Sequence, residues 1–420
     1  MPQLLVESAE YGHFWGNIFV EISRTQLRGT RRISMRMKSL SVLGLVCGLA
    51  TPAISLAEVE ISGYLSWAAN LASSDNTTDT SYYNALANTE NVDFDTRSNH
   101  VGVQLYSGLT ERVSVTLGLT AEGGQSGYSV EPEWAYGTYQ FNDDWGLRMG
   151  RFKGPFFMVS DYRDVGYAYP WVRPPEEVYS TNPIKSINGL DLVFQKTTQN
   201  VNFLLEIYGG NGKSETLVNA NIAPGFCPTC SPTDVPFEFE TYDSLGFNAS
   251  IGTEAITFRA GYYDTKVDAA VPPPLASIDG ESGSFAGVGL IVDYLNMVLY
   301  SEYIQRDTEN SVSMNVAFPD QNAWYVTLGY RFRSVLPYVT FADLDEGKDA
   351  SPFALRQSSV ALGLRWDIDD AAAVKFEAKQ IDPDVTDFSA VGGPTGKIGL
   401  WDAPQVDKGN VYTITFDTIF

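Results

Sequence analysis

From Val59 onward the chain alternates between apolar and polar positions with a period of two residues. In the first such segment Val59, Ile61 and Leu65 share one face, while Glu60 and Ser62 share the other. A period of two is typical of β-strands that have one apolar and one polar face. The sequence therefore predicts an all-β protein.

Sixteen segments follow this pattern and predict sixteen strands. They lie at 59–67, 101–106, 113–122, 134–141, 145–152, 190–194, 201–207, 245–251, 256–262, 286–292, 297–303, 324–330, 339–341, 360–366, 374–378 and 412–416. Short turns and long polar connections join them in strict alternation. Short periplasmic turns and long external loops are typical of transmembrane antiparallel β-barrels. About sixteen strands predict a lumen wide enough for water.

The beginning of the chain predicts a secretory leader. Residues 35–57 combine a basic start at Lys38, a short apolar stretch and a small-residue site, which predicts a signal peptide cut after Ala57. Residues 1–34 have no strand or helix pattern, and we interpret them as a mis-annotated extension. No later run reaches the roughly 20 apolar residues of a membrane helix. Residues 58–420 would therefore enter a membrane only as a closed barrel.

Charge and composition exclude one class of partner. The formal charge is −23, and removing residues 1–57 takes away six basic and three acidic groups, which leaves 22 basic and 48 acidic groups and a charge of −26. An acidic chain without a basic patch does not bind nucleic acid. The 23 Tyr, 23 Phe and 37 Gly suit strands, tight turns and interfacial belts. A soluble secreted β protein has the same composition and remains an alternative.

The last segment is amphipathic and ends at Phe420. A terminal aromatic residue in this position resembles the signal that outer-membrane barrel-assembly machinery reads. With the leader, the first strand Glu58–Tyr64 and the strand Gly146–Arg151, the chain resembles the Gram-negative general porin family over nearly all of residues 58–420. The resemblance implies a homotrimer in the outer membrane, in contact with lipid and lipopolysaccharide.

In that family the loop after the fifth strand folds into the pore. Here the corresponding connection is 153–188, and its charged residues are Asp161, Arg163, Asp164, Arg173, Glu176 and Glu177. The resemblance implies that they narrow the pore. Charges on the loop and on the facing wall would then set up a field across the lumen. A solvated Glu176–Glu177 pair is the alternative.

Strand parity predicts basic residues on the lumen side of the wall. They are Arg148, Arg259, Arg331, Arg365 and Lys375. Local pairing of each with a neighbouring acid is the alternative to a role in the pore. Ion selectivity stays open at this point, with the charge of −26 favouring cations.

Cys227 and Cys230 lie in a Pro-rich connection, and in an oxidising compartment they predict a local disulfide. A redox pair or metal site is the alternative, although His100 is the only histidine after residue 57. Parity places His100 on the lumen side. A barrel hydrolase depends on an activated histidine, and no nucleophile or phosphate-loop motif accompanies this one. We therefore expect no enzyme activity, cofactor or metal.

The sequence thus predicts a channel for passive diffusion of small hydrophilic solutes and ions. A channel selective for sugar, phosphate or peptide is an alternative, because aromatic residues at Tyr162–Trp171 suit sugar transport. A non-conducting adhesion or structural barrel is another.

Overall fold

The computed structural model describes residues 58–74, 82–83, 87–88, 91–94, 99–124, 127–218, 235–270, 277–309, 311–346, 356–387, 395–397, 400 and 408–420. The predicted leader, the preceding extension and the pair Cys227 and Cys230 lie outside these ranges.

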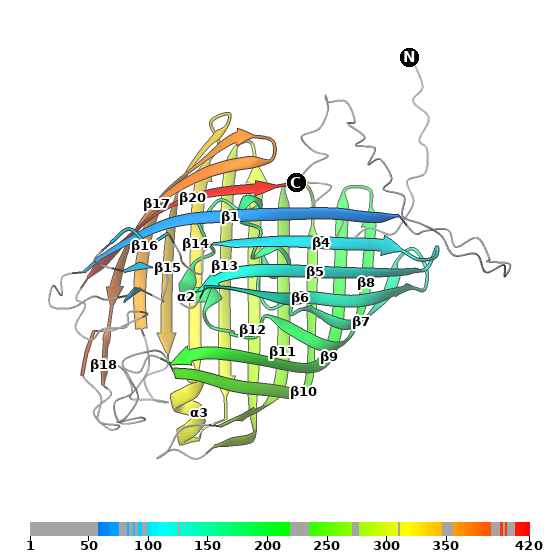
Figure 1. Ribbon diagram of the computed structural model, residues 1–420, viewed down its shortest axis with the longest axis horizontal. Helices are drawn as coiled ribbons and strands as arrows, with labels where there is room; N and C mark the ends of the chain where they lie inside the picture. The colour runs from blue at the N-terminus through cyan, green and yellow to red at the C-terminus, as the bar shows by residue number, and fades with distance from the viewer. Residues whose placement is uncertain are drawn as a thin grey trace, which may run out of the picture.

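Sixteen strands within these ranges close into one antiparallel barrel (Figure 1). They are β1 (Val59–Ser74), β4 (His100–Gly108), β5 (Val113–Gly124), β6 (Gly127–Gln140), β7 (Trp145–Lys153), β8 (Ser186–Thr198), β9 (Val201–Val218), β10 (Val235–Gly252), β11 (Ile256–Ala269), β12 (Ile278–Tyr294), β13 (Met297–Thr308), β14 (Gln321–Tyr330), β15 (Val335–Glu346), β16 (Arg356–Asp369), β17 (Ala372–Pro383) and β20 (Gly409–Ile419). Each strand pairs with its neighbours in the chain, and β1 pairs with β20. The predicted all-β barrel of sixteen strands is confirmed.

The remaining elements are short and lie in the connections. They are β2 (Tyr82–Tyr83), β3 (Ala87–Asn88), β18 (Val385–Asp387), β19 (Thr395–Lys397), the 3-10 turns η1 (Ser160–Tyr162) and η2 (Gly166–Ala168), and the helices α2 (Glu176–Tyr179) and α3 (Val312–Ala317). In the N-cap of α3, the Ser311 hydroxyl accepts a hydrogen bond from the Met314 N–H. Among the described helices, none has the length and apolar character needed to cross a membrane.

The seam between β1 and β20 is closed by the end of the chain. The Gly63 N–H donates to the Phe420 carbonyl at 2.9 Å, and the Phe420 N–H donates to the Gly63 carbonyl at 3.0 Å. The Phe420 ring lies so close to Gly63 that any side chain there would collide with it. Closure leaves no unpaired edge strand, as a sheet within lipid requires.

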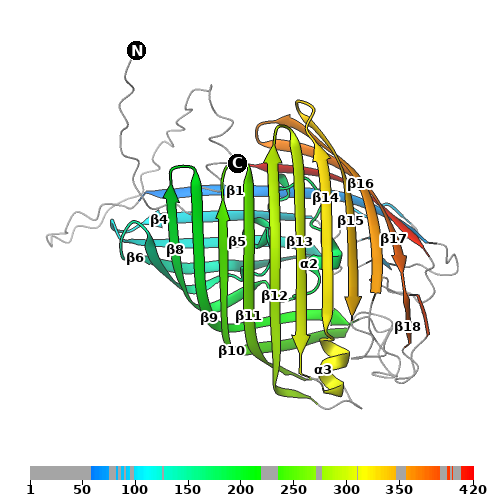
Figure 2. The ribbon, with the colours of Figure 1, turned by 180° about the vertical axis from the view of Figure 1, so that it is seen from behind.

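The connections are short at one end of the barrel and mostly long at the other. In Figure 2 the β8–β9 hairpin and the C-terminus lie toward the upper end, and α3 lies toward the lower end. The prediction of strict alternation is wrong at one place, because β5 ends at Gly124 and β6 already begins at Gly127. A register shift between Gly118 and Leu119 lets β6 continue past Pro132.

The two faces of the wall differ as the alternation predicts. Outward side chains are apolar and exposed, for example Leu245 at 63% and Leu362 at 64%. Inward residues are polar or small, for example Thr327, Ser359 and Ala361, and all three are buried. Such an apolar exterior is stable in hydrocarbon and unfavourable in water. The largest core cluster lies inside the barrel, where the β7–β8 connection packs against the wall.

Candidate functional site

The candidate site is the connection between β7 and β8, residues 154–185, which we call the lumen loop. It is slightly shorter than the predicted 153–188, because Lys153 ends β7 and Asn188 already belongs to β8. The loop carries η1, η2 and α2, and Figure 1 shows α2 within the barrel. Its partners include His100 of β4 and Arg259 of β11, which are seven strands apart in the closed barrel, so the loop crosses the lumen.

On one side the lumen loop is held by aromatic packing. The Phe156 ring lies 4.9 Å from the Tyr263 ring of β11, centroid to centroid. The Trp171 ring lies 5.4 Å from the Tyr325 ring of β14, and its Nε1 donates to the Thr327 hydroxyl at 2.8 Å. Edge-to-face pairs of this kind add to the energy of apolar burial. The loop is therefore fixed against β11–β14 by its apolar residues.

A wall acid secures the same part of the loop. Glu302 of β13 accepts hydrogen bonds from the Met158 N–H at 2.8 Å and from the Tyr179 hydroxyl at 3.1 Å. Arg259 of β11 lies 3.9 Å from Glu302 and donates to the Phe156 carbonyl at 3.1 Å. The predicted wall residue Arg259 thus contacts a loop carbonyl and a wall acid.

Farther round the wall, on β16 and β17, two predicted basic residues bind carbonyls of the lumen loop. Arg365 of β16 donates to the Tyr167 and Tyr169 carbonyls at 2.7 and 2.9 Å. Lys375 of β17 donates to the Gly166 and Trp171 carbonyls at 2.5 and 2.6 Å. Gly166 also lies against Asp417 of β20, with no space for a side chain. Wall cations here hold the loop backbone instead of facing loop acids across open water.

The other two predicted wall residues do not contact the loop in this way. Arg148 of β7 forms buried ion pairs with Asp191 of β8 and Glu206 of β9, so it joins neighbouring wall strands. Arg331 follows β14 at the short-turn end and lies 2.8 Å from Asp293. Both arginines therefore pair with nearby acids, which was the alternative to a role in the pore.

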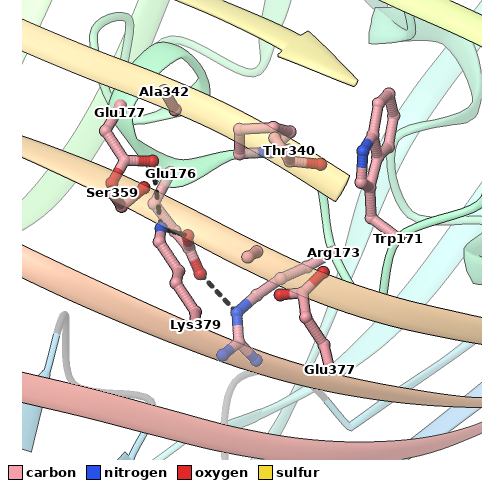
Figure 3. Close-up of a pocket in the computed structure, with 11 residues that line it drawn as sticks. Trp171, Arg173, Glu176, Glu177, Thr340, Ala342, Ser359, Glu377 and Lys379 are labelled. Carbon is pink, nitrogen blue, oxygen red and sulfur yellow. Dashed lines mark hydrogen bonds and ion pairs between the residues drawn. The ribbon is translucent and has the colours of Figure 1, made fainter. Parts of the chain in front are cut away.

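The acidic pair of the lumen loop contacts a lysine that the sequence analysis did not single out. Lys379 Nζ of β17 lies 2.5 Å from Glu176 Oε2 and 2.9 Å from Glu177 Oε2 (Figure 3). Arg173 Nε lies 2.5 Å from Glu176 Oε1, and its guanidinium also donates to Asn70 of β1 at 3.0 Å. The pair is buried rather than solvated.

These cations decide the protonation of Glu176. Burial opposes its ionisation, but Lys379 and then Arg173 outweigh burial and lower its pKa to about 2. Glu176 is therefore ionised at neutral pH, and the ion pairs tie α2 to β17.

The remaining three charged residues predicted for the loop, Asp161, Arg163 and Asp164, have separate contacts. Lys153 forms an ion pair with Asp164, and this lysine more than offsets burial, so the pKa of Asp164 is well below its usual range. His100 Nε2 contacts the Asp164 carbonyl, which places His100 on the lumen side as parity predicts. Burial, followed by the charge of Glu206, raises the pKa of Asp161 to about 7. Arg163 lies over the Tyr179 ring at 5.8 Å.

The sequence carried a signal for the residues that were missed. Glu377 and Lys379 have the same parity as Lys375, so alternation alone places all three on the lumen face of β17. Their partners depend on the path of a loop about 200 residues earlier in the chain, which alternation does not reveal.

Two small cavities lie beside the loop. One, of about 10 Å³, is bounded by the loop residues Trp171–Glu177 and by β15, β16 and β17 (Figure 3). The other, of about 50 Å³, lies between residues 181–184, β10–β13 and α3. Within the described ranges no cluster of three or more Asp, Glu, His or Cys residues has metal-binding geometry.

Comparison with known proteins shows the fold. No protein-family model and no curated protein sequence matches this chain. Among solved structures, the trimer form of in-vitro folded OmpT, an outer-membrane protein of Vibrio cholerae, is 12% identical with a TM-score of 0.52, and the match covers 87% of this chain and 99% of that one. OmpF of Salmonella typhi in complex with daunomycin is 12% identical with a TM-score of 0.54, and the match covers 86% of this chain and 98% of that one. The outer-membrane channel DcaP of Acinetobacter baumannii is 14% identical with a TM-score of 0.51, and the match covers 89% of this chain and 100% of that one. The chain has the barrel fold of outer-membrane porins.

Proposed function

We propose that this chain is an outer-membrane channel through which small hydrophilic solutes and ions diffuse passively. The observation that carries the proposal is a closed barrel of sixteen strands with an apolar exterior, whose polar interior is crossed by a charged loop held by β11 and by β4. A barrel of this size without a loop leaves an aqueous passage, and an inserted loop narrows it. The proposed role is transport, not catalysis.

The lumen loop is the proposed constriction. Of the six charged residues predicted for it, Arg173, Glu176 and Glu177 form one ion-paired group with Lys379, and Asp164 pairs with Lys153. Solutes would pass beside these pairs, so size and charge both affect their passage. We also propose a homotrimer surrounded by lipid and lipopolysaccharide, with Phe420 read by the barrel-assembly machinery.

A substrate-selective channel is the second candidate. It is favoured by the way the loop reaches β14 through Trp171 and β1 through Arg173, because contacts five strands apart on the wall leave less free cross-section. Trp171 also gives the passage beside β15–β17 an aromatic surface.

Liposome swelling separates these proposals. Liposomes containing the folded protein should swell in isotonic solutions of small sugars and amino acids, at rates that fall steadily with solute size. Swelling that saturates for one solute class and is absent for others of equal size would favour the selective channel. If protein shown to be folded by its heat-modifiable migration gave no swelling with any solute, both channel proposals would be contradicted. A structural barrel would then be the remaining candidate.

A further inference from the structure

The small cavity between the lumen loop and β15–β17 has more acids than bases. Its lining includes the carboxylates of Glu176, Glu177 and Glu377 and the cations Arg173 and Lys379. When all five side chains are ionised, the three carboxylates and two cations leave one negative charge in this cavity (Figure 3).

Both cations are engaged with the acids of the loop. Lys379 lies between Glu176 and Glu177, at 2.5 and 2.9 Å, and Arg173 holds the other oxygen of Glu176 at 2.5 Å. These contacts neutralise the loop acids in place. A solute that passes the loop therefore meets ion pairs, not open carboxylates.

Glu377 differs from the loop acids. It lies on the lumen face of β17 between Lys375 and Lys379, but Lys375 pairs with Asp417 at 3.1 Å and Lys379 pairs with the loop. The Glu377 carboxylate accepts a hydrogen bond from the Tyr338 hydroxyl at 2.8 Å. Across the part of the chain that the structure describes, no Lys or Arg forms an ion pair with it.

We propose that Glu377 is the residue that gives the channel its preference for cations. This inference rests on the proposed function, because it requires an open passage. A passing cation takes the place of the ion-pair partner that Glu377 lacks, whereas an anion is repelled. The cavity of about 10 Å³ accepts one water-sized group, so the favoured group is a small cation such as potassium or a primary ammonium.

The selectivity is located on the wall and not on the loop. The loop carries the more conspicuous acids, Glu176 and Glu177, but Lys379 and Arg173 together neutralise them. Removing the charge of Glu377 therefore changes selectivity without releasing the loop.

Reversal potentials in planar bilayers test this. With a gradient of potassium chloride at pH 8, the wild-type channel should be cation-selective. In Glu377→Gln the ratio of cation to anion permeability should fall by roughly threefold to fivefold, the effect of one charge about 4 Å from an ion in water. Glu377→Asp should keep most of the wild-type ratio.

Asp343→Asn is the matched control, because Asp343 lies on the outward face of β15, two strands from β17, and this variant loses the same charge outside the lumen. It should leave the ratio unchanged. A conducting Glu377→Gln channel with the wild-type ratio would overturn this inference and leave the proposed function intact. A folded wild-type protein that does not conduct would overturn both.

Discussion

The ammonium group of Lys379, on wall strand β17, lies 2.9 Å from Oε2 of Glu177 in the loop that crosses the lumen. Both side chains are buried, and 202 residues of chain separate them. A buried cation that also reaches Glu176 fixes the position of α2 inside the barrel. The loop is thus held at this end by charge and at the other end by aromatic packing.

Replacing Lys379 should release this end of the loop. In Lys379→Met, Glu176 and Glu177 would remain buried without their shared cation, which costs on the order of 3–5 kcal/mol. Moving α2 into water avoids that cost, so we expect a larger single-channel conductance and more current noise. Lys196→Met is the control, because Lys196 pairs with Asp144 at the exposed end of β8. Equal conductance in wild type and Lys379→Met would show that the ion pair does not limit the passage.

Acid should weaken the same attachment. Lys379 and Arg173 outweigh burial and lower the pKa of Glu176 from 4.5 to about 2. Because the folded pKa is the lower one, the stabilisation is complete above pH 4.5 and is lost as the pH falls toward 2. The difference in heat-modification temperature between wild type and Lys379→Met should therefore be constant from about pH 7 to pH 5 and shrink below pH 4.5. A difference that already disappears between pH 7 and pH 5 contradicts this assignment.

The terminal residue should matter more for assembly than for the finished barrel. Phe420 is 67% exposed, and its backbone pairs with Gly63. Phe420→Ser keeps those backbone hydrogen bonds, so the purified variant should refold in detergent with nearly wild-type heat stability. In cells we expect much less folded protein in the outer-membrane fraction. Normal amounts of the folded variant in the outer-membrane fraction would show that Phe420 is not an assembly signal.

The Trp171 side chain should stabilise the loop more than the barrel. It is 1% exposed, and Trp→Ala at a buried site costs roughly 3–5 kcal/mol. The barrel strands are held by their own ladders, so Trp171→Ala should still migrate as a folded barrel. Protease should cut its lumen loop faster than that of the wild type, while Trp366→Ala, on the outer face of β16, should leave the rate unchanged. An uncut loop in Trp171→Ala would contradict the anchoring role.

The strands were predictable because a wall between lipid and water imposes alternation at every position. The short β5–β6 connection was not predictable from the sequence, because Gly123, Gly124 and Pro132 indicate a loop. In the structure, a bulge opposite Leu119 accommodates Pro132 within β6. A breaker residue does not reveal whether its own strand has a bulge that accommodates it.

The site was predictable in part. The resemblance identified the lumen loop, and parity placed Arg259, Arg365 and Lys375 against it. The choice of partners was not predictable, because carbonyls of Gly166 and Trp171 compete with acids for the same lysine. That choice depends on the path of the loop, which the alternation of apolar and polar residues does not reveal.

Single-channel recording of the wild type beside a variant with Asp161–Glu177 shortened tests the central claim most directly. If the lumen loop constricts an open barrel, the wild type gives discrete current steps, and the variant gives larger steps with altered selectivity. Steps of the same size and selectivity from both folded proteins would contradict a constricting loop, and no steps from either would contradict a channel.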